Sequence, residues 1–431
     1  MASNGKLPKG WTESRIDEVA DVSISSVDKK SVEGQRSVRL CNYMDVWKNP
    51  YIHHGLDFME ATASEIEIDR FSLAPGDVLL TKDSETKEEI AEPSVVWEKI
   101  DNLILGYHLA LVRPHAAVTD GPFLAAQLRI PEFRSQFIRA ASGATRYGLS
   151  MDTVCGAKVW LPPYELQTKI SGIIRSIDEA IEATRAVIEP TRRLKTALLQ
   201  DLLTNGLPGQ HKKFNTSKRG LSFPESWEHL PLGQVAEFQN GKAFPSSDYD
   251  QGTVPLLRPG NLHISGRVMW DAGHTTTVPD SYLDSASDYI VRSNELVMNL
   301  TAQSLEDDFL GRVCWTHNTE ECCLLNQRLA RFRAINCNLR FLYWTFKGPA
   351  FRDHVSRLPS GSKVQHLYNA DLESFYVPLP DPGEQQKIAQ VLDSAEEREQ
   401  QEHSYLERLF ATKSALSQGL LTGRIPVKGG K

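Results

Sequence analysis

The sequence has no apolar run long enough to cross a bilayer, which would need about 18 to 20 consecutive apolar residues. Charged side chains also interrupt its first twenty residues, which therefore do not resemble a secretory signal. We expect a cytoplasmic protein with no membrane partner.

Cysteine is scarce as well, with six residues among 431 and no Cys-x-x-Cys pair. In a reducing compartment we expect no disulfide framework, and the spacing does not support a zinc site. We predict that the chain binds no metal and that most of its thiols are buried; they are Cys41, Cys155, Cys314, Cys322, Cys323 and Cys337.

An excess of basic charge is also missing, because 55 acidic residues outnumber 48 basic ones and the formal net charge is -7. Residues 1–160 and 223–376 are each net acidic, whereas 161–222 are net basic. The chain cannot grip a polyanion with its whole surface. Any contact with nucleic-acid phosphates must come from local clusters or from a partner.

Motifs of self-sufficient enzymes are absent. There is no P-loop, no His-Glu-x-x-His and no Gly-x-Ser-x-Gly. Pro162-Pro163-Tyr164 matches the end of an amino-methyltransferase motif, but Leu161 stands where that motif needs an Asn or Asp to accept from the target amine. A methyltransferase that works alone is therefore not supported.

A metal-dependent nuclease is the other enzymatic alternative. Asp77 with Glu85 and Lys87 loosely resembles the carboxylates and lysine of such a site. Glu295 occupies the position of Asp77 in the second half of the chain but has no matching Glu-x-Lys. We predict no catalytic residues.

The strongest positive feature is a duplication with an offset of 216 to 218 residues. Leu7-Pro8-Lys9-Gly10-Trp11 returns as Phe223-Pro224-Glu225-Ser226-Trp227, and Gln167-Thr168-Lys169-Ile170 returns as Gln385-Gln386-Lys387-Ile388. Leu202-Leu203-Thr204 corresponds to Leu420-Leu421-Thr422. Solenoid repeats are 20 to 50 residues long, so the repeated unit is a whole domain with a connecting element.

Each unit changes character along its length. Residues 11–160 and 227–376 mix short β-branched and aromatic runs with Gly, Pro and Asn, which predicts strand-rich α+β globules. A helical period follows each globule. The predicted fold is α+β, with two similar globular heads separated by two long antiparallel coiled-coil helices and related by an internal pseudo-two-fold repeat.

The predicted coiled-coil seam has apolar residues spaced alternately by four and three. In the first helix the seam is Leu166, Ile170, Ile173, Ile177, Ala180, Thr184, Val187, Thr191, Leu194 and Leu198. In the second it is Ile388, Val391, Ala395, Arg398, Glu402, Tyr405, Leu409, Thr412 and Leu416. Pro190 is expected to kink or interrupt the first helix. Helices of about 40 residues would rise roughly 60 Å and could hold two heads apart on a repetitive ligand such as duplex DNA.

Polar and basic clusters recur at matching places in the two heads. Arg, Lys, Asn and Gln can read base edges in the major groove, so these clusters are the predicted DNA-binding residues. In the first head they are Lys29, Lys30, Arg36, Arg39, Asn42, Lys82, Ser84, Arg146 and Tyr147. In the second head they are Lys242, Arg258, Asn261, Asn299, Gln303, Ser304, Lys363 and Gln365.

With these features in place, the chain resembles the specificity subunit of type I restriction-modification systems over essentially its whole length. The resemblance rests on the Leu-Pro-x-Gly-Trp opening and its repeat, the Ser-Gly pairs at Ser142 and Ser360, the Pro-x-x-x-x-Gln-x-Lys-Ile helix starts and the Leu-Leu-Thr ends. One departure is Leu166, where the second repeat keeps Glu384 before its glutamine.

The resemblance implies two target recognition domains, at 1–160 and 222–376, that read the halves of an asymmetric bipartite target in double-stranded DNA. It implies helical spacers at 161–221, with a basic linker, and at 377–431, which bind two modification subunits. Those subunits would carry S-adenosylmethionine and methylate adenine at N6, and restriction subunits would use ATP and Mg; this chain would bind no cofactor. Partner-binding candidates are Gln167, Ile170, Ile177, Leu194, Leu198, Gln385, Ile388, Tyr405, Leu409 and Leu416. A scaffold that joins two protein-binding heads is the competing hypothesis.

Overall fold

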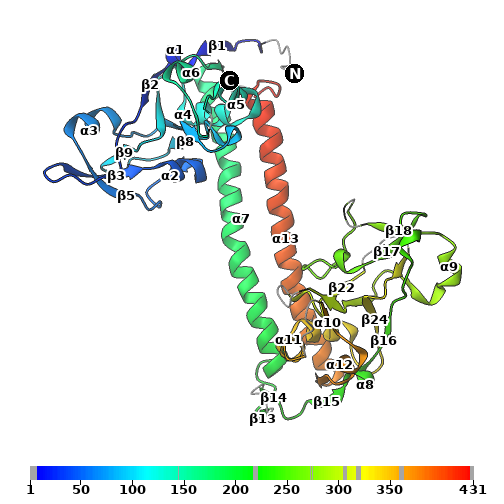
Figure 1. The fold of residues 1–431 in the computed structure, drawn as a ribbon. Coiled ribbons are helices and arrows are strands. Elements are labelled where there is room, and N and C mark those ends of the chain that lie inside the picture. Colours follow the sequence, from blue (N-terminus) through cyan, green and yellow to red (C-terminus); the bar gives the residue numbers. More distant parts are fainter. Residues whose placement is uncertain are drawn as a thin grey trace. The chain divides into compact units, whose positions relative to one another are not determined.

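The computed structural model describes residues 7–143, 145–216, 222–271, 273, 275–303, 308–316, 322–358 and 364–427. The chain divides into two compact units, one of residues 1–186 with 404–431 and one of residues 187–403. Each unit contains a mixed α/β head together with segments of two long helices (Figure 1).

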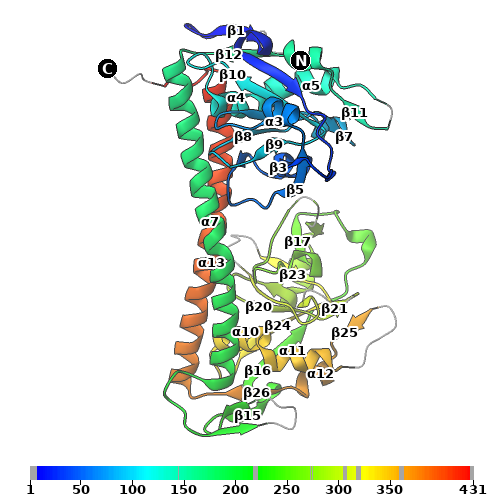
Figure 2. The same cartoon turned by 90° about the vertical axis from the view of Figure 1, so that its left-hand side faces the viewer.

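The first head is built on a five-stranded sheet and a three-stranded sheet (Figure 2). The larger sheet has the order β2 (Ala20–Ile24), β10 (Leu109–Pro114), β6 (Val78–Thr81), β8 (Pro93–Val96) and β4 (Tyr51–Ile52). The smaller sheet has the order β5 (Met59–Ala63), β3 (Arg36–Cys41) and β9 (Leu103–Leu105). Two-stranded pairs are formed by β1 (Thr12–Arg15) with β12 (Lys158–Leu161) and by β7 (Asp83–Ser84) with β11 (Tyr147–Gly148). The helices are α1 (Ile16–Val19), α2 (Tyr43–Lys48), α3 (Glu65–Phe71), α4 (Gly121–Arg129), α5 (Pro131–Ala140) and α6 (Met151–Cys155).

The second head repeats this plan with two four-stranded sheets. One has the order β16 (Ala236–Asn240), β24 (Leu329–Ala334), β20 (Leu296–Asn299) and β22 (Val313–Trp315). The other has the order β18 (Thr276–Val278), β17 (Val254–Leu257), β23 (Cys323–Leu325) and β19 (Ile290–Val291). The two-stranded pairs are β15 (Glu228–Pro231) with β26 (Tyr376–Leu379), β21 (Thr301–Ala302) with β25 (Gln365–His366), and β13 (Phe214–Thr216) with β14 (Ser222–Pro224). Its helices are α8 (Leu232–Val235), α9 (Tyr282–Ser285), α10 (Leu339–Lys347), α11 (Pro349–Ser356) and α12 (Asn369–Glu373).

Strand registers show that the heads are structural duplicates. In the first head Glu13 lies opposite Trp160, and in the second His229 lies opposite Pro378. The parallel pair of β3 with β9 likewise has its counterpart in β17 with β23. The internal repeat found in the sequence is therefore a repeat of topology.

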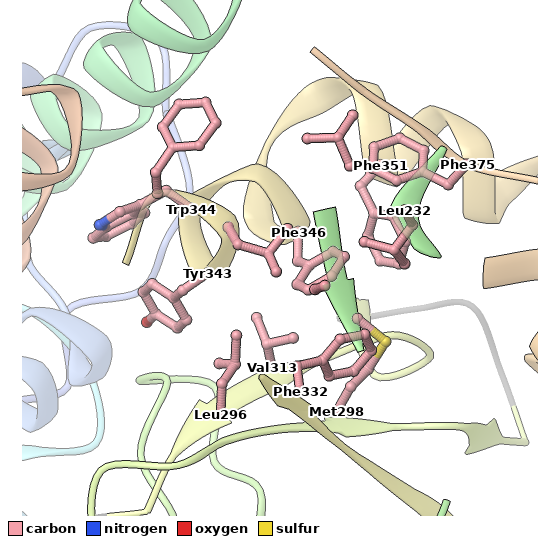
Figure 3. Packing of buried hydrophobic residues seen from close by; sticks show 14 of the residues in the cluster. Leu232, Leu296, Met298, Val313, Phe332, Tyr343, Trp344, Phe346, Phe351 and Phe375 are labelled. Carbon is pink, nitrogen blue, oxygen red and sulfur yellow. The ribbon is translucent and has the colours of Figure 1, made fainter. Parts of the chain in front are cut away.

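The core of the second head is aromatic (Figure 3). Helix α10 buries Tyr343, Trp344 and Phe346 completely, and Phe332 and Phe351 pack against Phe346 with ring centroids 5.0 and 4.8 Å away. Apolar side chains of the long helices join the same cluster, namely Leu202, Leu203, Ile388, Ala389 and Leu392. Because the helices contribute to this core, the head and its helical segments form one packed body.

The long helices are α7 (Tyr164–Asn205) and α13 (Pro382–Leu421). They run antiparallel within each unit, since Asp178 pairs with Lys413 and Arg185 lies over the ring of Phe410. In the second unit Lys195 pairs with Glu399. The prediction of two long antiparallel helices is confirmed.

Pro190 was expected to kink or interrupt the first helix; the interruption is wrong, because α7 continues through Pro190. Pro190 lacks the N–H that would bond the carbonyl of Ala186, four residues earlier. Both residues are exposed, so water can satisfy that carbonyl.

Part of the predicted seam of α7 is displaced around the helix, although the seam residues Ile170 and Thr184 are buried, with 1% and 6% exposure. Ile174 and Ile181 are buried, with 4% exposure each, whereas the predicted seam residues Ile173, Val187 and Leu194 are 38%, 42% and 59% exposed. A shift of one residue turns the face by about 100°. Apolar residues occupy both the predicted seam positions and the positions one residue later. The sequence spacing therefore did not show which of these two rows of residues faces the core.

Candidate nucleic-acid interface

Two short strand pairs bring together many of the predicted DNA-binding residues. In the first head β6 leads through Lys82 into β7, which pairs Ser84 with Tyr147 of β11. In the second head β20 leads into β21, which pairs Ala302 with Gln365 of β25. Segments separated by some sixty residues in sequence thus form one polar rim in each head.

Lys82 is less available than its sequence position suggested. Its Nζ lies 2.9 Å from a carboxylate oxygen of Asp83 and the side chain is 17% exposed. His108 Nδ1 lies 2.6 Å from Asp83 Oδ2. Asp83 therefore holds Lys82 and His108 in place and offsets part of the charge of Lys82.

Tyr147 is half-buried, and the Lys87 ammonium lies 5.3 Å from its ring centroid. The Tyr107 and His108 rings lie 3.9 Å apart, and Tyr107 is 44% exposed. Tyr107, His108 and Lys87 were not among the predicted residues. Sequence spacing gave no signal for them, because Tyr107 and His108 precede β10 and come near Asp83 of β7 only in the folded head.

The Ser-Gly motif before Arg146 closes a hairpin. Ser142 and Gly148 exchange two backbone hydrogen bonds, of 2.9 and 3.2 Å. Gly143 has a φ of +141°, and a Cβ there would lie 1.9 Å from the carbonyl oxygen of Arg146. A glycine is required, and it leaves the Arg146 side chain exposed at the hairpin tip.

The rim of the second head is mostly uncharged and polar. Gln303 is exposed and Gln365 half-buried. A neighbouring hollow of about 490 Å³ is lined by the polar side chains Asn240, Gln327, His366, Tyr368 and Asn369 among others. Ser304 and Lys363, which were predicted beside these residues, lie outside the described part of the chain.

Three predicted asparagines are structural, which corrects the sequence-based assignment. Asn299 is fully buried, and its Nδ2 donates to the carbonyls of Thr301 and Phe309. Asn261 is 1% exposed; its Oδ1 accepts from the backbone of Arg258 and its Nδ2 donates to the carbonyl of Met269. Asn42 is 9% exposed at the start of α2. Buried amides that bond the backbone are not free to read bases.

Two predicted basic residues of the second head are also held by neighbours. The Arg258 guanidinium donates to Thr276 and lies 5.3 Å from the Tyr249 ring centroid. Lys242 lies about 6 Å from the ring centroids of Tyr282 and Tyr289. Both side chains are half-buried, so they are less accessible to DNA than the prediction assumed.

Of the remaining predicted residues of the first head, Ser84 is 4% exposed and its hydroxyl donates to the Thr86 carbonyl, which makes it structural and corrects its assignment. The other four are exposed. Lys30 forms a surface ion pair with Asp28, and Lys29 is exposed beside it. Arg36 reaches Asn102 with one long hydrogen bond of 3.4 Å, and Arg39 is exposed on the same strand, β3. These side chains can move to meet a phosphate at low cost.

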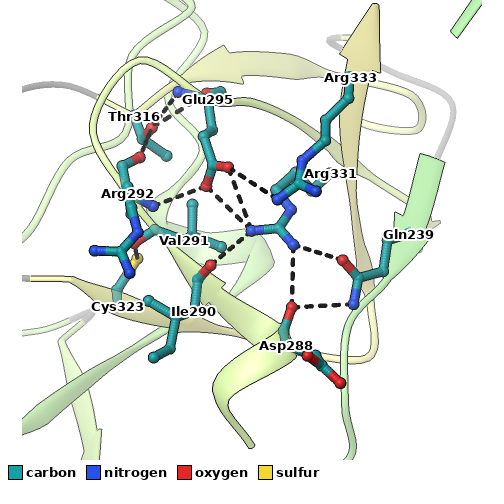
Figure 4. Close-up of polar contacts among 10 residues, drawn as sticks. All are labelled: Gln239, Asp288, Ile290, Val291, Arg292, Glu295, Thr316, Cys323, Arg331 and Arg333. Atoms are coloured by element: carbon teal, nitrogen blue, oxygen red, sulfur yellow. Dashed lines mark hydrogen bonds and ion pairs between the residues drawn. The ribbon is translucent and has the colours of Figure 1, made fainter. Parts of the chain in front are cut away.

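The carboxylates of the nuclease alternative are used structurally in both heads. Asp77 is 2% exposed and forms a two-point ion pair with Arg113, at 2.8 and 2.7 Å. At the corresponding positions Glu295 pairs with Arg331, which also donates to Gln239 and to the Ile290 and Asp288 carbonyls (Figure 4). No group of three or more metal-ligating side chains occurs among the residues that the structure describes.

The predicted partner-binding residues fall into two groups. Gln167 and Gln385 are each 1% exposed and clamp the starts of α7 and α13: each accepts from a head N–H, of Asp120 or Asn338, and donates to the carbonyl of a preceding proline. Ile170 and Ile388 are buried in the head cores. These four cannot meet a partner, which corrects the assignment. Leu194 and Tyr405 are 59% and 44% exposed, and the half-buried remainder are Ile177, Leu198, Leu409 and Leu416.

Comparison with known proteins points to one family. The type I restriction modification DNA specificity domain matches residues 224–408. The MjaVIII type I restriction enzyme specificity subunit of Methanocaldococcus jannaschii is 24% identical over 428 residues, covering 98% of this chain and 95% of that protein. The EcoBI specificity subunit of Escherichia coli is 28% identical over 178 residues, covering 40% of this chain and 33% of that protein.

Solved structures share the fold. The S subunit of a type I restriction-modification system from M. genitalium aligns with a TM-score of 0.58 at 14% identity, covering 100% of this chain and 99% of that one. A chain from the assembly of a type I R-M system aligns with a TM-score of 0.54 at 16% identity, covering 98% and 100%. Among the described residues, no helix is long and apolar enough to span a membrane.

Proposed function

Because this chain belongs to the specificity subunits of type I restriction-modification systems, which confer DNA specificity, we propose that it reads an asymmetric bipartite sequence in double-stranded DNA. Each head reads one half. The repeated polar rim, made by β7 with β11 and by β21 with β25, is the observation that carries this proposal.

The two rims differ in chemistry although their backbones correspond. The first presents Arg146, Tyr147 and Tyr107, whereas the second presents Gln303, Gln365 and Tyr368. Arginine favours guanine and glutamine favours adenine in the major groove. Two heads that share a fold but present different side chains on their rims would read two different half-sites.

The helices carry the partner surface in this proposal. Exposed apolar residues on α7 (Ile173, Val187, Leu194) and on α13 (Val391, Tyr405, Phe410) would meet two modification subunits. Those subunits hold S-adenosylmethionine and methylate adenine at N6, and restriction subunits bring ATP and Mg. This chain, itself non-catalytic, determines the DNA sequence at which those subunits act.

The experiment is methylation of DNA libraries by the complex with modification subunits. Arg146→Ala should cost about 1 to 3 kcal/mol on the cognate site and relax specificity in one half only. Gln303→Ala should relax the other half. Arg139→Ala, which removes an exposed charge on α5, is the matched control.

Equal relaxation of both halves by either variant would contradict the assignment of one head to each half. A single continuous sequence requirement would contradict the bipartite reading. If this chain left the DNA affinity and specificity of the modification subunits unchanged, it would be a scaffold.

A further inference from the structure

A cavity in the second head has a filled counterpart in the first. It measures about 210 Å³ and lies where β15 and β26 meet the end of α7 and the start of α11. His229, Phe223, Phe375, Pro349, Pro378 and Leu203 form much of its wall. An apolar cavity of roughly 150 Å³ is large enough to bind benzene, so this one can hold a larger ring.

The duplication shows what fills the corresponding place in the first head. Pro378 on β26 has the strand position of Trp160 on β12, because Pro378 lies opposite His229 and Trp160 opposite Glu13. The Trp160 ring packs edge-on against Phe133 at 5.4 Å, and its Nε1 donates to Glu13 Oε2 at 3.2 Å. One head therefore supplies an indole at this site and the other supplies a proline.

The hydrogen-bond acceptor of that site is kept in the second head. His229 stands where Glu13 stands, and its Nε2 is buried without a hydrogen-bond partner in the described structure. Burial lowers the pKa of His229, which favours the neutral ring with one nitrogen free to accept. An unpaired buried nitrogen is costly, so an incoming N–H donor that pairs with it gains stability.

We propose that this cavity binds an indole ring from outside the chain, and that the ring is a tryptophan side chain of a modification subunit. The choice of occupant follows from the first head, where the same wall receives an indole with its N–H on residue 13. The modification subunit as the source of this tryptophan rests on the proposed function. Leu203 and Thr204 of α7 line the cavity, and Leu194 on the same helix is exposed and available to a partner.

Indole itself is the first probe, titrated into the full chain and followed by ligand-observed NMR. We expect saturable binding at one site that Pro378→Trp abolishes by supplying the ring internally. His229→Phe keeps a flat ring but removes the acceptor. It should weaken indole binding at least fivefold and leave 1-methylindole, which has no N–H, unchanged. Trp160→Ala, the matched control, should open a second site in the first head.

Assembly with the modification subunit is the second measurement. Pro378→Trp should weaken assembly at least tenfold while the melting temperature of the free chain stays the same or rises. No saturable indole binding, or equal binding by Pro378→Trp, would overturn the site. Indole binding with unchanged assembly would overturn the tryptophan source. Failure of the proposed function is distinct, because the wild-type complex would then show no DNA specificity.

Discussion

At the residue scale, the two heads keep one arginine–carboxylate pair with different carboxylates; Asp77 is the buried member in the first head and Arg331 in the second. Arg113 pairs with Asp77 and Arg331 pairs with Glu295, at equivalent places in β10 and β24. Arg331 is only 4% exposed and satisfies two carbonyls as well as the carboxylate. These arginines hold the sheet to its neighbouring loops.

Removing Arg331 should be strongly destabilising. In Arg331→Ala the Glu295 carboxylate loses its buried cationic partner, and the carbonyls of Ile290 and Asp288 each lose one hydrogen bond. Breaking a buried pair costs about 3 to 5 kcal/mol. Arg333→Ala, which removes a side chain that is 63% exposed, should change stability by less than about 0.5 kcal/mol. Thermal unfolding of the full chain compares the variants. Similar losses in both would refute the structural role of Arg331.

Cysteine reactivity follows from burial. Desolvation raises the pKa of Cys314 and of Cys323 to about 12, and Cys41 is fully buried. The reactive form is the thiolate, so these thiols should resist a disulfide reagent at pH 8. Native and denatured protein should therefore differ by at least three titratable thiols. Rapid native modification of Cys314, identified by mass spectrometry, would contradict this.

At the element scale, helix α7 presents two different apolar stripes. One contains Ile174 and Ile181 and is buried; the other contains Ile173, Val187 and Leu194 and is exposed. The first stabilises the units. The second is available for a partner. Residues that stabilise the fold and residues that can bind a partner are therefore different residues of the same helix.

Adjacent isoleucines test this separation. Ile174 is 4% exposed in the core of the first head, so Ile174→Ala should cost about 2 to 5 kcal/mol. Ile173→Ala should cost under about 1 kcal/mol and should instead weaken assembly with the modification subunit. Chemical unfolding and titration calorimetry measure the two effects. The reverse ranking in unfolding would mean that the buried stripe is wrongly placed.

At the scale of the whole molecule, net charge limits how tightly the chain alone can bind DNA. With a formal charge of -7 and both heads net acidic, the surface as a whole repels phosphates, and only local groups of cations can contact them. Lys82 and Lys30 are among those already paired with carboxylates. In the proposed function we therefore expect DNA affinity to come largely from partner subunits that add positive surface.

Salt titration tests this dependence. The logarithm of affinity falls with the logarithm of salt concentration in proportion to the phosphates contacted. We expect a slope no steeper than about -3 for the free chain and a much steeper one for the complex. Fluorescence anisotropy on one labelled duplex measures both. Tight binding by the free chain with a steep slope would contradict the proposal.

The sequence by itself determined the duplication, the α+β heads and the two long helices, because a fixed offset and a helical period are properties of residue order. It also placed Lys82, Ser84, Tyr147 and Gln365 on matching segments. Only the tertiary structure decided which polar residues are free. Asn261 and Asn299 look like base readers in sequence, yet their amides satisfy buried backbone groups.

The same limit applies to the helices and to the cavity. Ile173 and Ile174 are chemically identical, and only packing against the head distinguishes them. The sequence repeat shows that Pro378 stands in the second head where Trp160 stands in the first, but it does not show that a cavity results. That consequence needed the strand register, which sets His229 beside a cavity and leaves its Nε2 without a partner.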